Sequence, residues 1–245
     1  MNKILISYAN ERYATFQTIL SESALSIGKV DNVINFGPSY IQSTDFYQKN
    51  KYILDQPRGN GFWLYKPKII LDTLENANSD DTIMYCDSGL SVIGNLTPLF
   101  DIAQTRPNDG IMLFRLPGPH INRTWTKRDC FILTGCDSDR YWNGELVNGA
   151  MSLWCKTERS LAFLKEWLKL CRDPRILTDD QSIMGQEFMD FRDHRHDQSV
   201  LSLLAIKHEL EVFRSPCQWA YNETDIAKFN NSNYEQLVNH HRGAI

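Results

Sequence analysis

The sequence lacks the features that mark several large functional classes. Its 245 residues carry 26 Lys and Arg against 30 Asp and Glu, a net charge of −4. This is not the basic excess that drives non-specific binding to nucleic acid. No apolar run approaches the ~18–20 residues that cross a membrane, and the N-terminal segment MNKILISY has no signal-peptide cleavage site. We therefore expect a cytoplasmic protein with no transmembrane segment and no nucleic-acid partner.

Paired cysteine motifs are also missing. None of the six cysteines forms a C-x-x-C pair, and most lie in apolar runs. This pattern is typical of buried thiols in a reducing compartment.

The chain contains none of the motifs of the commonest α/β enzymes. Neither G-x-G-x-x-G nor G-x-x-x-x-G-K-[ST] occurs, which disfavours a Rossmann-type dinucleotide enzyme and a P-loop enzyme. The nucleophile elbow G-x-S-x-G and the zinc motif H-E-x-x-H are absent as well.

What is present indicates one α/β domain with a substantial core, because 42% of the residues are hydrophobic. Periodicity predicts strands at residues 3–8, 31–36, 82–86, 110–116, 131–133 and 148–155. It predicts helices at residues 11–27, 44–54, 67–76, 96–104, 157–172 and 197–207. This alternation favours a single domain with a mostly parallel sheet flanked by helices. In such sheets, ligands bind outside the carboxyl ends of the strands.

Asp87 is the first candidate for such a site. It follows the apolar strand segment Ile83-Met84-Tyr85-Cys86 directly, and Gly89 next to it allows close approach of the backbone. A carboxylate there can hold a divalent cation or bind a ribose hydroxyl; the alternative is a turn or helix-capping residue. A second acidic pair, Asp137-Ser138-Asp139, ranks below it because the strand before it is less distinct.

The segment R58-G-N-G-F-W-L-Y-K-P67 combines glycines, three aromatic residues and two cations. Such a composition suits a loop that closes over an anionic ligand. Lys66 precedes a predicted helix whose N-terminal amides favour phosphate. The alternative is an ordinary loop with its aromatic residues in the core.

His194, His196 and Asp197 form a dense polar cluster. One interpretation is the metal site of a hydrolase, although the ligand order of metallo-β-lactamase-like hydrolases is not met. In the other interpretation Asp197 caps the following helix and the histidines are solvated.

Taken in order, three segments resemble a family. GFWLYKPKII (61–70), YCDSG (85–89) and HRHDQSVLSLL (194–204) are similar to the G-[YF]-W-x-W-K-P, Y-x-D-[AS]-G and H-R-x-D-Q-S segments of small bacterial and viral glycosyltransferase-like proteins. More broadly, the chain resembles nucleotide-sugar glycosyltransferases of the GT-A fold, over about residues 1–243. The resemblance implies one glycosyltransferase domain, with a nucleotide-binding half at about 1–115 and a half for acceptor and sugar at about 116–245.

The resemblance also implies roles for individual residues. The nucleotide would lie at Ser7, Tyr8 and Ala9, and the D-x-D position would fall on Asp87, Ser88 and Gly89. The second acidic residue is therefore replaced by glycine. Mn²⁺ or Mg²⁺ would be held by Asp87 with His240 or His241. The diphosphate would meet Arg58, Lys66 and Arg242, and the transferred sugar would meet Asn148, Gly149, Asp197 and Gln198.

Several alternatives stay open from the sequence. Basic residues alone, without a metal, would also neutralise the diphosphate. An inverting reaction needs a base near the acceptor, for which Asp179, Asp180 and Asp197 are candidates; a retaining reaction does not. Besides a glycosyltransferase, the sequence allows a non-catalytic nucleotide- or carbohydrate-binding protein on the same fold, and a metal hydrolase built on the His194, His196 and Asp197 cluster.

Overall fold

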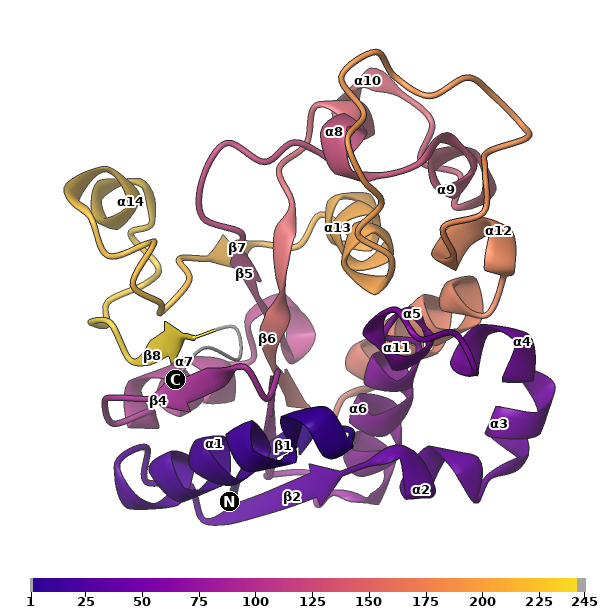
Figure 1. Ribbon diagram of the computed structural model, residues 1–245. Helices are drawn as coiled ribbons and strands as arrows, with labels where there is room; N and C mark the ends of the chain where they lie inside the picture. The colour runs from indigo at the N-terminus through magenta and orange to yellow at the C-terminus, as the bar shows by residue number, and fades with distance from the viewer. Residues whose placement is uncertain (1, 242–245) are drawn as a thin grey trace.

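The computed structural model describes residues 2–241, which form a mixed α/β domain around one six-stranded sheet (Figure 1). The strand order is β2-β1-β3-β6-β5-β7. These strands are β1 (Lys3–Tyr8), β2 (Asn32–Phe36), β3 (Thr82–Cys86), β5 (Ile111–Arg115), β6 (Val147–Cys155) and β7 (Val212–Phe213). The pairs β1–β2, β1–β3 and β5–β7 are parallel, and only β6 runs antiparallel to its neighbours β3 and β5. The predicted mostly parallel sheet is confirmed.

Helices cover both faces of the sheet. Successive strand residues alternate between two cores: Ile6 and Tyr85 belong to one, and Leu5 and Met84 to the other. The first core packs against α6 (Tyr65–Asn76), α11 (Glu158–Cys171) and α13 (Asp197–Lys207), and the second against α1 (Ala14–Ser26) and α7 (Thr97–Gln104) (Figure 1). The N-cap residue Thr157 forms a capping box with Ser160 and so starts α11.

Short elements complete the fold. They are the 3₁₀ turns η1 (Glu11–Tyr13) and η2 (Pro107–Asp109), and the helices α2 (Pro38–Gln42), α3 (Asp45–Lys49), α4 (Lys51–Leu54), α5 (Gly59–Phe62), α8 (Asn122–Trp125), α9 (Arg128–Leu133), α10 (Asp139–Trp142), α12 (Pro174–Leu177) and α14 (Glu223–Lys228). None of the helices within residues 2–241 is long and apolar enough to span a membrane.

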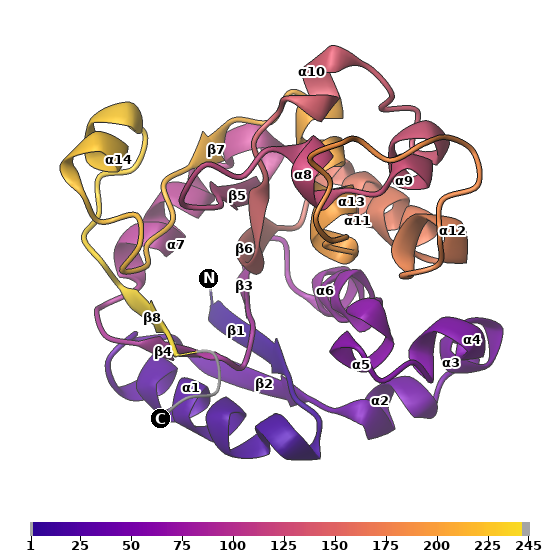
Figure 2. The same ribbon diagram turned by 45° about the horizontal axis from the view of Figure 1, so that its top comes forward.

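The end of the described chain returns to the N-terminal half. A second sheet pairs β4 (Leu90–Val92) with β8 (Val238–His240), and Leu90 faces His240 in its register. Figure 2 shows β8 lying against β4, beside α1. This pairing places the late histidine next to the end of β3.

Two secondary-structure predictions are wrong. Residues 131–133, predicted as a strand, belong to α9, because so short an apolar run fits either state and burial of Cys130 and Phe131 on a helix decides it. The single helix predicted at 44–54 is divided into α3 and α4 at Asn50. The Asn50 side-chain amide donates to Phe46 O at 2.7 Å, and such local bonds compete with a continuous helix.

Antiparallel β6 decides where the chemistry gathers. Because it runs against β3, its first residues lie at the carboxyl end of that strand. The backbone N–H of Asp87 donates to Ala150 O at 2.8 Å. Asn148 and Gly149 therefore lie beside Asp87, as expected for strand ends that meet at one sheet edge.

Candidate functional site

A cavity of about 510 Å³ opens at the carboxyl edge of the sheet. We call it the larger cavity. Of the residues predicted from the sequence, it brings together Tyr8, Ala9, Arg58, Asp87, Ser88, Gly89 and His240. Ser7 lies behind its wall: the buried hydroxyl contacts Asn35 Oδ1 at 3.1 Å and accepts from Gln17 Nε2 at 3.0 Å. Ser7 thus orders the end of β1 instead of lining the cavity.

A second cavity, of about 160 Å³, joins the first and is called here the smaller cavity. Its walls include the other predicted site residues Lys66, Asn148, Gly149, Asp197 and Gln198. The two cavities share Arg58, Trp63 and Asp87. Gly149 leaves little space at this wall, because a Cβ atom at this position would lie 3.0 Å from the Gln198 side chain. Strand β6 and helix α13 therefore approach closely at this wall.

A buried ammonium group joins the two acidic residues of the site. Lys66 Nζ lies 3.3 Å from Asp87 Oδ1 and 3.1 Å from Asp197 Oδ2, and it donates to Gly149 O at 2.8 Å. The Tyr85 hydroxyl donates to the same Asp87 oxygen at 2.6 Å. Lys66 lies in the first turn of α6, not before the helix as the sequence suggested. One charge cluster thus connects the end of β3, which carries Asp87, with α6 and α13, which carry Lys66 and Asp197.

The cluster shifts the pKa values of Asp197 and Lys66. Burial raises the pKa of Asp197 to about 6, and nearby Asp87 adds to that rise while Lys66 opposes it. Burial alone would lower the pKa of Lys66, but attraction to Asp197 and Asp87 outweighs it and the pKa is raised. Lys66 is therefore charged at neutral pH, and Asp197 is the group whose charge changes near physiological pH.

The segment after Arg58 forms a left-handed turn. Every residue from Gly59 to Trp63 has a positive φ, including Asn60 (52°), Phe62 (52°) and Trp63 (59°). For Asn60, Phe62 and Trp63 this conformation costs of order 1–3 kcal/mol each, and such residues cluster at functional sites. Glycine is required at position 59, since a Cβ atom there would lie 2.3 Å from the Trp63 ring. The loop predicted from composition is therefore a specific, strained wall of both cavities.

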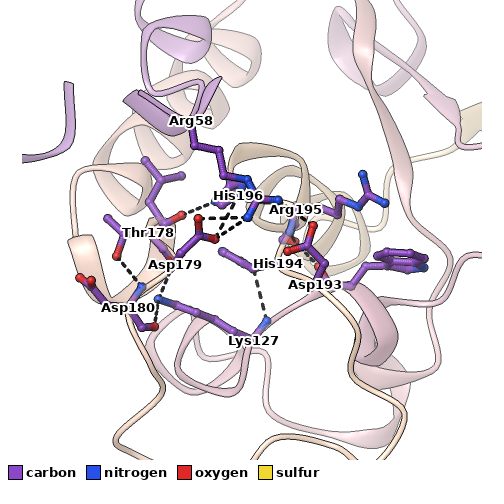
Figure 3. Close-up of polar contacts among 12 residues, drawn as sticks. Arg58, Lys127, Thr178, Asp179, Asp180, Asp193, His194, Arg195 and His196 are labelled. Carbon is purple, nitrogen blue, oxygen red and sulfur yellow. Dashed lines mark hydrogen bonds and ion pairs between the residues drawn. The ribbon is translucent and has the colours of Figure 1, made fainter. Parts of the chain in front are cut away.

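Arg58 connects this wall to the second half of the chain. Its NH1 lies 3.0 Å from Asp179 Oδ1 and its NH2 lies 2.6 Å from Asp193 Oδ2. Figure 3 shows the side chain reaching down to both carboxylates, beside His196. Arg58 closes the site from one side through surface ion pairs, and such pairs contribute only about 0–1 kcal/mol.

The described residues do not support the metal-hydrolase interpretation. His194 uses both ring nitrogens on the backbone: Nδ1 accepts from Lys127 N at 3.3 Å and Nε2 lies 2.8 Å from Ile176 O. His196 Nδ1 lies 2.8 Å from Leu177 O. Neither imidazole is solvated, because both are buried. Within residues 2–241 there is no group of three or more His, Cys, Asp or Glu side chains that could hold a metal ion.

The same finding bears on the metal predicted at Asp87. His240 lines the larger cavity with Asp87, whereas the His241 ring packs 5.2 Å from Phe16 and its backbone N–H donates to Gly89 O at 3.1 Å. One oxygen of Asp87 already contacts Lys66 and Tyr85. These residues do not fit a metal ion held by protein side chains alone. Arg242, predicted to meet the diphosphate, lies outside the described residues.

The second acidic pair belongs elsewhere in the structure. The Asp137 carboxylate is bound by the Arg128 guanidinium and accepts from Trp142 Nε1 at 2.9 Å. Asp139 lies in the first turn of α10 and accepts from Asn143 Nδ2 at 2.6 Å. Neither residue lines the larger or the smaller cavity.

The larger cavity is also lined by Asn10, at the end of the first strand, and by Asn60, Trp63 and Tyr65 of the segment predicted to close over a ligand, whereas sequence reasoning missed Arg12 and Tyr13. Asn10 Oδ1 is buried there without a hydrogen-bond partner. Tyr8 and Tyr65 stack with their ring centroids 3.7 Å apart, and Tyr8 contacts Asn60 through its hydroxyl. The position of Asn10 directly after the first strand was the available signal.

No protein-family model and no curated protein matches this sequence. Solved structures match its fold. Mouse xyloside xylosyltransferase 1 superposes with a TM-score of 0.56 at 11% sequence identity, over 98% of this chain and 97% of that one. The bifunctional glycosyltransferase WbbM gives a TM-score of 0.54 at 9% identity, over 98% of this chain and 45% of that one. The chain has the fold of these glycosyltransferases.

Proposed function

We propose that the protein is a glycosyltransferase that moves a sugar from a nucleotide-sugar donor to an acceptor hydroxyl. One observation carries the proposal: two cavities of unequal size meet at Asp87 and Arg58, at the carboxyl edge of the sheet. A nucleotide sugar has a matching order of parts: a large nucleoside for the larger cavity, a diphosphate for the junction, and a sugar for the smaller cavity. The shared fold with glycosyltransferases supports this assignment.

The nucleoside would occupy the larger cavity. Its aromatic and amide side chains suit a base, because the half-buried Tyr13 and Trp63 offer ring surface and the buried Asn10 Oδ1 needs a donor such as a base N–H. The ribose would lie toward Asp87 and Ser88. The side chains that we assign to the base are uncharged, and the panel of nucleotide sugars described below identifies which base binds.

The diphosphate would lie at the junction of the cavities, beside Arg58. Cleavage of the bond between the anomeric carbon and the phosphate oxygen leaves the electron pair on the diphosphate, so positive charge must face it. Arg58 is exposed enough to turn toward this charge, whereas Lys66 is buried between two carboxylates. We assign Lys66 to holding Asp87 and Asp197 in place, and Arg58 to the leaving group.

The transferred sugar would fill the smaller cavity. Asp197 and Asn148 present hydrogen-bonding groups there. Gln198 closes its wall by donating to Val147 O at 2.7 Å. With its pKa near 6, Asp197 is ionised at neutral pH and accepts hydrogen bonds from sugar hydroxyls.

The test is turnover of a panel of nucleotide sugars, with and without an acceptor mixture. Turnover is measured as release of the nucleoside diphosphate. A xylose donor belongs in the panel because the mouse neighbour is a xyloside xylosyltransferase. Each donor is assayed with Mn²⁺, with Mg²⁺ and with EDTA. Release with EDTA present indicates that basic residues alone neutralise the diphosphate. Binding of a donor with no turnover under any condition identifies the non-catalytic alternative.

A further inference from the structure

His196 has a buried ring nitrogen with no hydrogen-bond partner. Its Nδ1 faces Leu177 O at 2.8 Å, and because a carbonyl oxygen only accepts, Nδ1 carries the hydrogen. Burial lowers the pKa of His196 to about 4, so the ring is neutral. Nε2 is then a bare acceptor, buried and unpartnered in a residue that is only 1% exposed.

This nitrogen faces a second acceptor. His196 Nε2 lies 3.6 Å from Asp179 Oδ1, and neither atom brings a hydrogen to the contact. The surrounding structure holds the arrangement firmly: the imidazole packs against Phe62 and Trp63, and the backbone at His196 has a φ of 53°. Two acceptors held together in this way are satisfied by a ligand that donates a hydrogen bond.

Arg58 covers the pair in the free protein. Its guanidinium binds Asp179 and Asp193 (Figure 3). Side chains of all three residues are about 40% exposed, with values of 40%, 43% and 38%. Ion pairs this exposed are weak, so a ligand of modest affinity is able to displace the guanidinium.

Beyond Arg58 lies a further cavity of about 500 Å³, which we call the acceptor cavity. Its lining includes four carboxylates, three cations and an aromatic ring: Asp179, Asp180, Glu187, Asp193, Arg58, Lys127, Arg192 and Phe191. Lys127 Nζ is directed to Thr178 O at 2.7 Å and to Asp180 O at 3.1 Å. Two of the three cations are therefore engaged within the protein.

This chemistry favours one class of ligand. Carboxylates and a bare imidazole nitrogen accept hydrogen bonds from hydroxyl groups and disfavour an anion. Phe191 adds apolar surface for the C–H face of a sugar ring. The His196–Asp179 contact lies where this cavity and the smaller cavity come together, because His196 lines one and Asp179 the other.

We propose that the acceptor cavity binds a neutral carbohydrate, and that one of its hydroxyl groups donates a hydrogen bond to His196 Nε2 after displacing Arg58. That this carbohydrate is the acceptor of glycosyl transfer rests on the proposed function. That the cavity binds a neutral carbohydrate does not, because it is argued from the hydrogen-bonding groups of the cavity alone. His196 acts as a binding and positioning residue that orients the hydroxyl toward the sugar in the smaller cavity.

The test uses ¹⁵N-labelled full-length protein and follows the His196 ring nitrogens by NMR. The probes are neutral methyl glycosides of glucose, galactose, mannose and xylose, with methyl glucuronide as the anionic match of the glucoside. We expect at least one neutral glycoside to shift the Nε2 resonance saturably. We expect methyl glucuronide to bind at least about tenfold more weakly, one like-charge contact near a protein surface being of that order.

Two variants form a matched pair. Asp179→Asn gives His196 Nε2 an amide donor inside the protein, so the glycoside-induced shift is lost. Asp190→Asn removes a carboxylate of similar exposure, 45% against 43% for Asp179, that pairs with Arg123 and lines neither the acceptor cavity nor the smaller cavity, so the glycoside is expected to bind as in the wild type. Melting temperatures measured without ligand serve as the check that both variants fold.

Three results overturn the inference: no neutral glycoside moves the His196 resonance in the wild type or in Arg58→Gln, glucuronide binds as well as glucoside, or Asp179→Asn binds the glycoside as tightly as Asp190→Asn does. A parallel melting experiment with nucleoside diphosphates separates this from the proposed function. Stabilisation by a nucleotide with an unmoved His196 refutes only the acceptor site. A glycoside response without any nucleotide response refutes the donor assignment and leaves the carbohydrate site.

Discussion

Lys66 and Asp197 form an ion pair inside the protein, with Nζ 3.1 Å from Oδ2 and both side chains only 4% exposed. Asp87 shares the same ammonium group. The site is therefore built around a buried cation that balances two carboxylates from different elements.

Removing this cation is expected to be costly. Lys66→Met leaves Asp87 and Asp197 facing each other without compensation, and loss of one partner of a buried pair costs about 3–5 kcal/mol. The control is Lys68→Met on the same helix. Lys68 pairs with Asp72 four residues on and is more exposed, so its loss is expected to cost about 1 kcal/mol or less. Urea unfolding measures both, and equal costs would contradict the account.

Stability is expected to depend on pH through Asp197. In the folded protein Asp197 keeps its proton up to about pH 6, whereas its ordinary pKa is 3.8. The folded state thus binds more protons than the unfolded state between these values. The contribution of Asp197 to the free energy of unfolding therefore falls by about 2 kcal/mol as the pH rises from 4 to 7.

Asp197→Asn lacks this titration and isolates the effect. Urea unfolding at pH 4, 5, 6 and 7 is expected to show the variant gaining stability relative to the wild type as the pH rises. A difference between the two proteins that stays constant over this range would show that Asp197 does not titrate there.

Asp87→Ala is expected to lower turnover by about 10²–10³-fold and to leave the fold intact. Asp87 lines both cavities, and its carboxylate binds the Lys66 ammonium group where they meet. Asp137→Ala is the matched control, because that carboxylate binds Arg128 away from both cavities. Rates are measured with the donor found in the panel; an Asp87→Ala variant with wild-type turnover would refute the location of the site.

The left-handed turn after Arg58 gives a further prediction. Gly59→Ala is expected to cost about 2–4 kcal/mol: about 1–2 kcal/mol from the left-handed backbone, and more from the Cβ atom 2.3 Å from the Trp63 ring. Gly135→Ala isolates the first part, since Gly135 also has a positive φ (71°) but no atom within 4 Å of the added Cβ. Urea unfolding compares the two. Identical losses would mean that Trp63 yields freely.

Local patterns were enough to predict most of the strands and helices along the chain and the position of Asp87 at the end of a strand. An apolar strand followed by Asp-Ser-Gly requires no tertiary information, and antiparallel β6 then brings Asn148 and Gly149 to the same edge. The partners of Lys66 could not be predicted in this way. A lysine at a helix start suggested a phosphate, but the fold places two carboxylates around it.

The ion-pair partners of Arg58 could not be predicted for the same reason. Its partners Asp179 and Asp193 lie 121 and 135 residues further along the chain. The bare nitrogen of His196 is set by the carbonyl of Leu177, which no pattern of side chains reveals. Contacts between loops far apart in the sequence depend on tertiary packing, which leaves no periodic pattern of residues that could be recognised in the sequence.

The central claim is that the larger cavity binds a nucleotide, and equilibrium melting with a panel of nucleoside diphosphates tests it most directly. A ligand that binds only the folded state stabilises it by about 2.7 kcal/mol at one hundred times its Kd. We expect one base to raise the melting temperature of the wild type, and Asn10→Ala to weaken that response. If no nucleoside diphosphate raises the melting temperature, with Mn²⁺ or with EDTA, the assignment of this cavity is wrong.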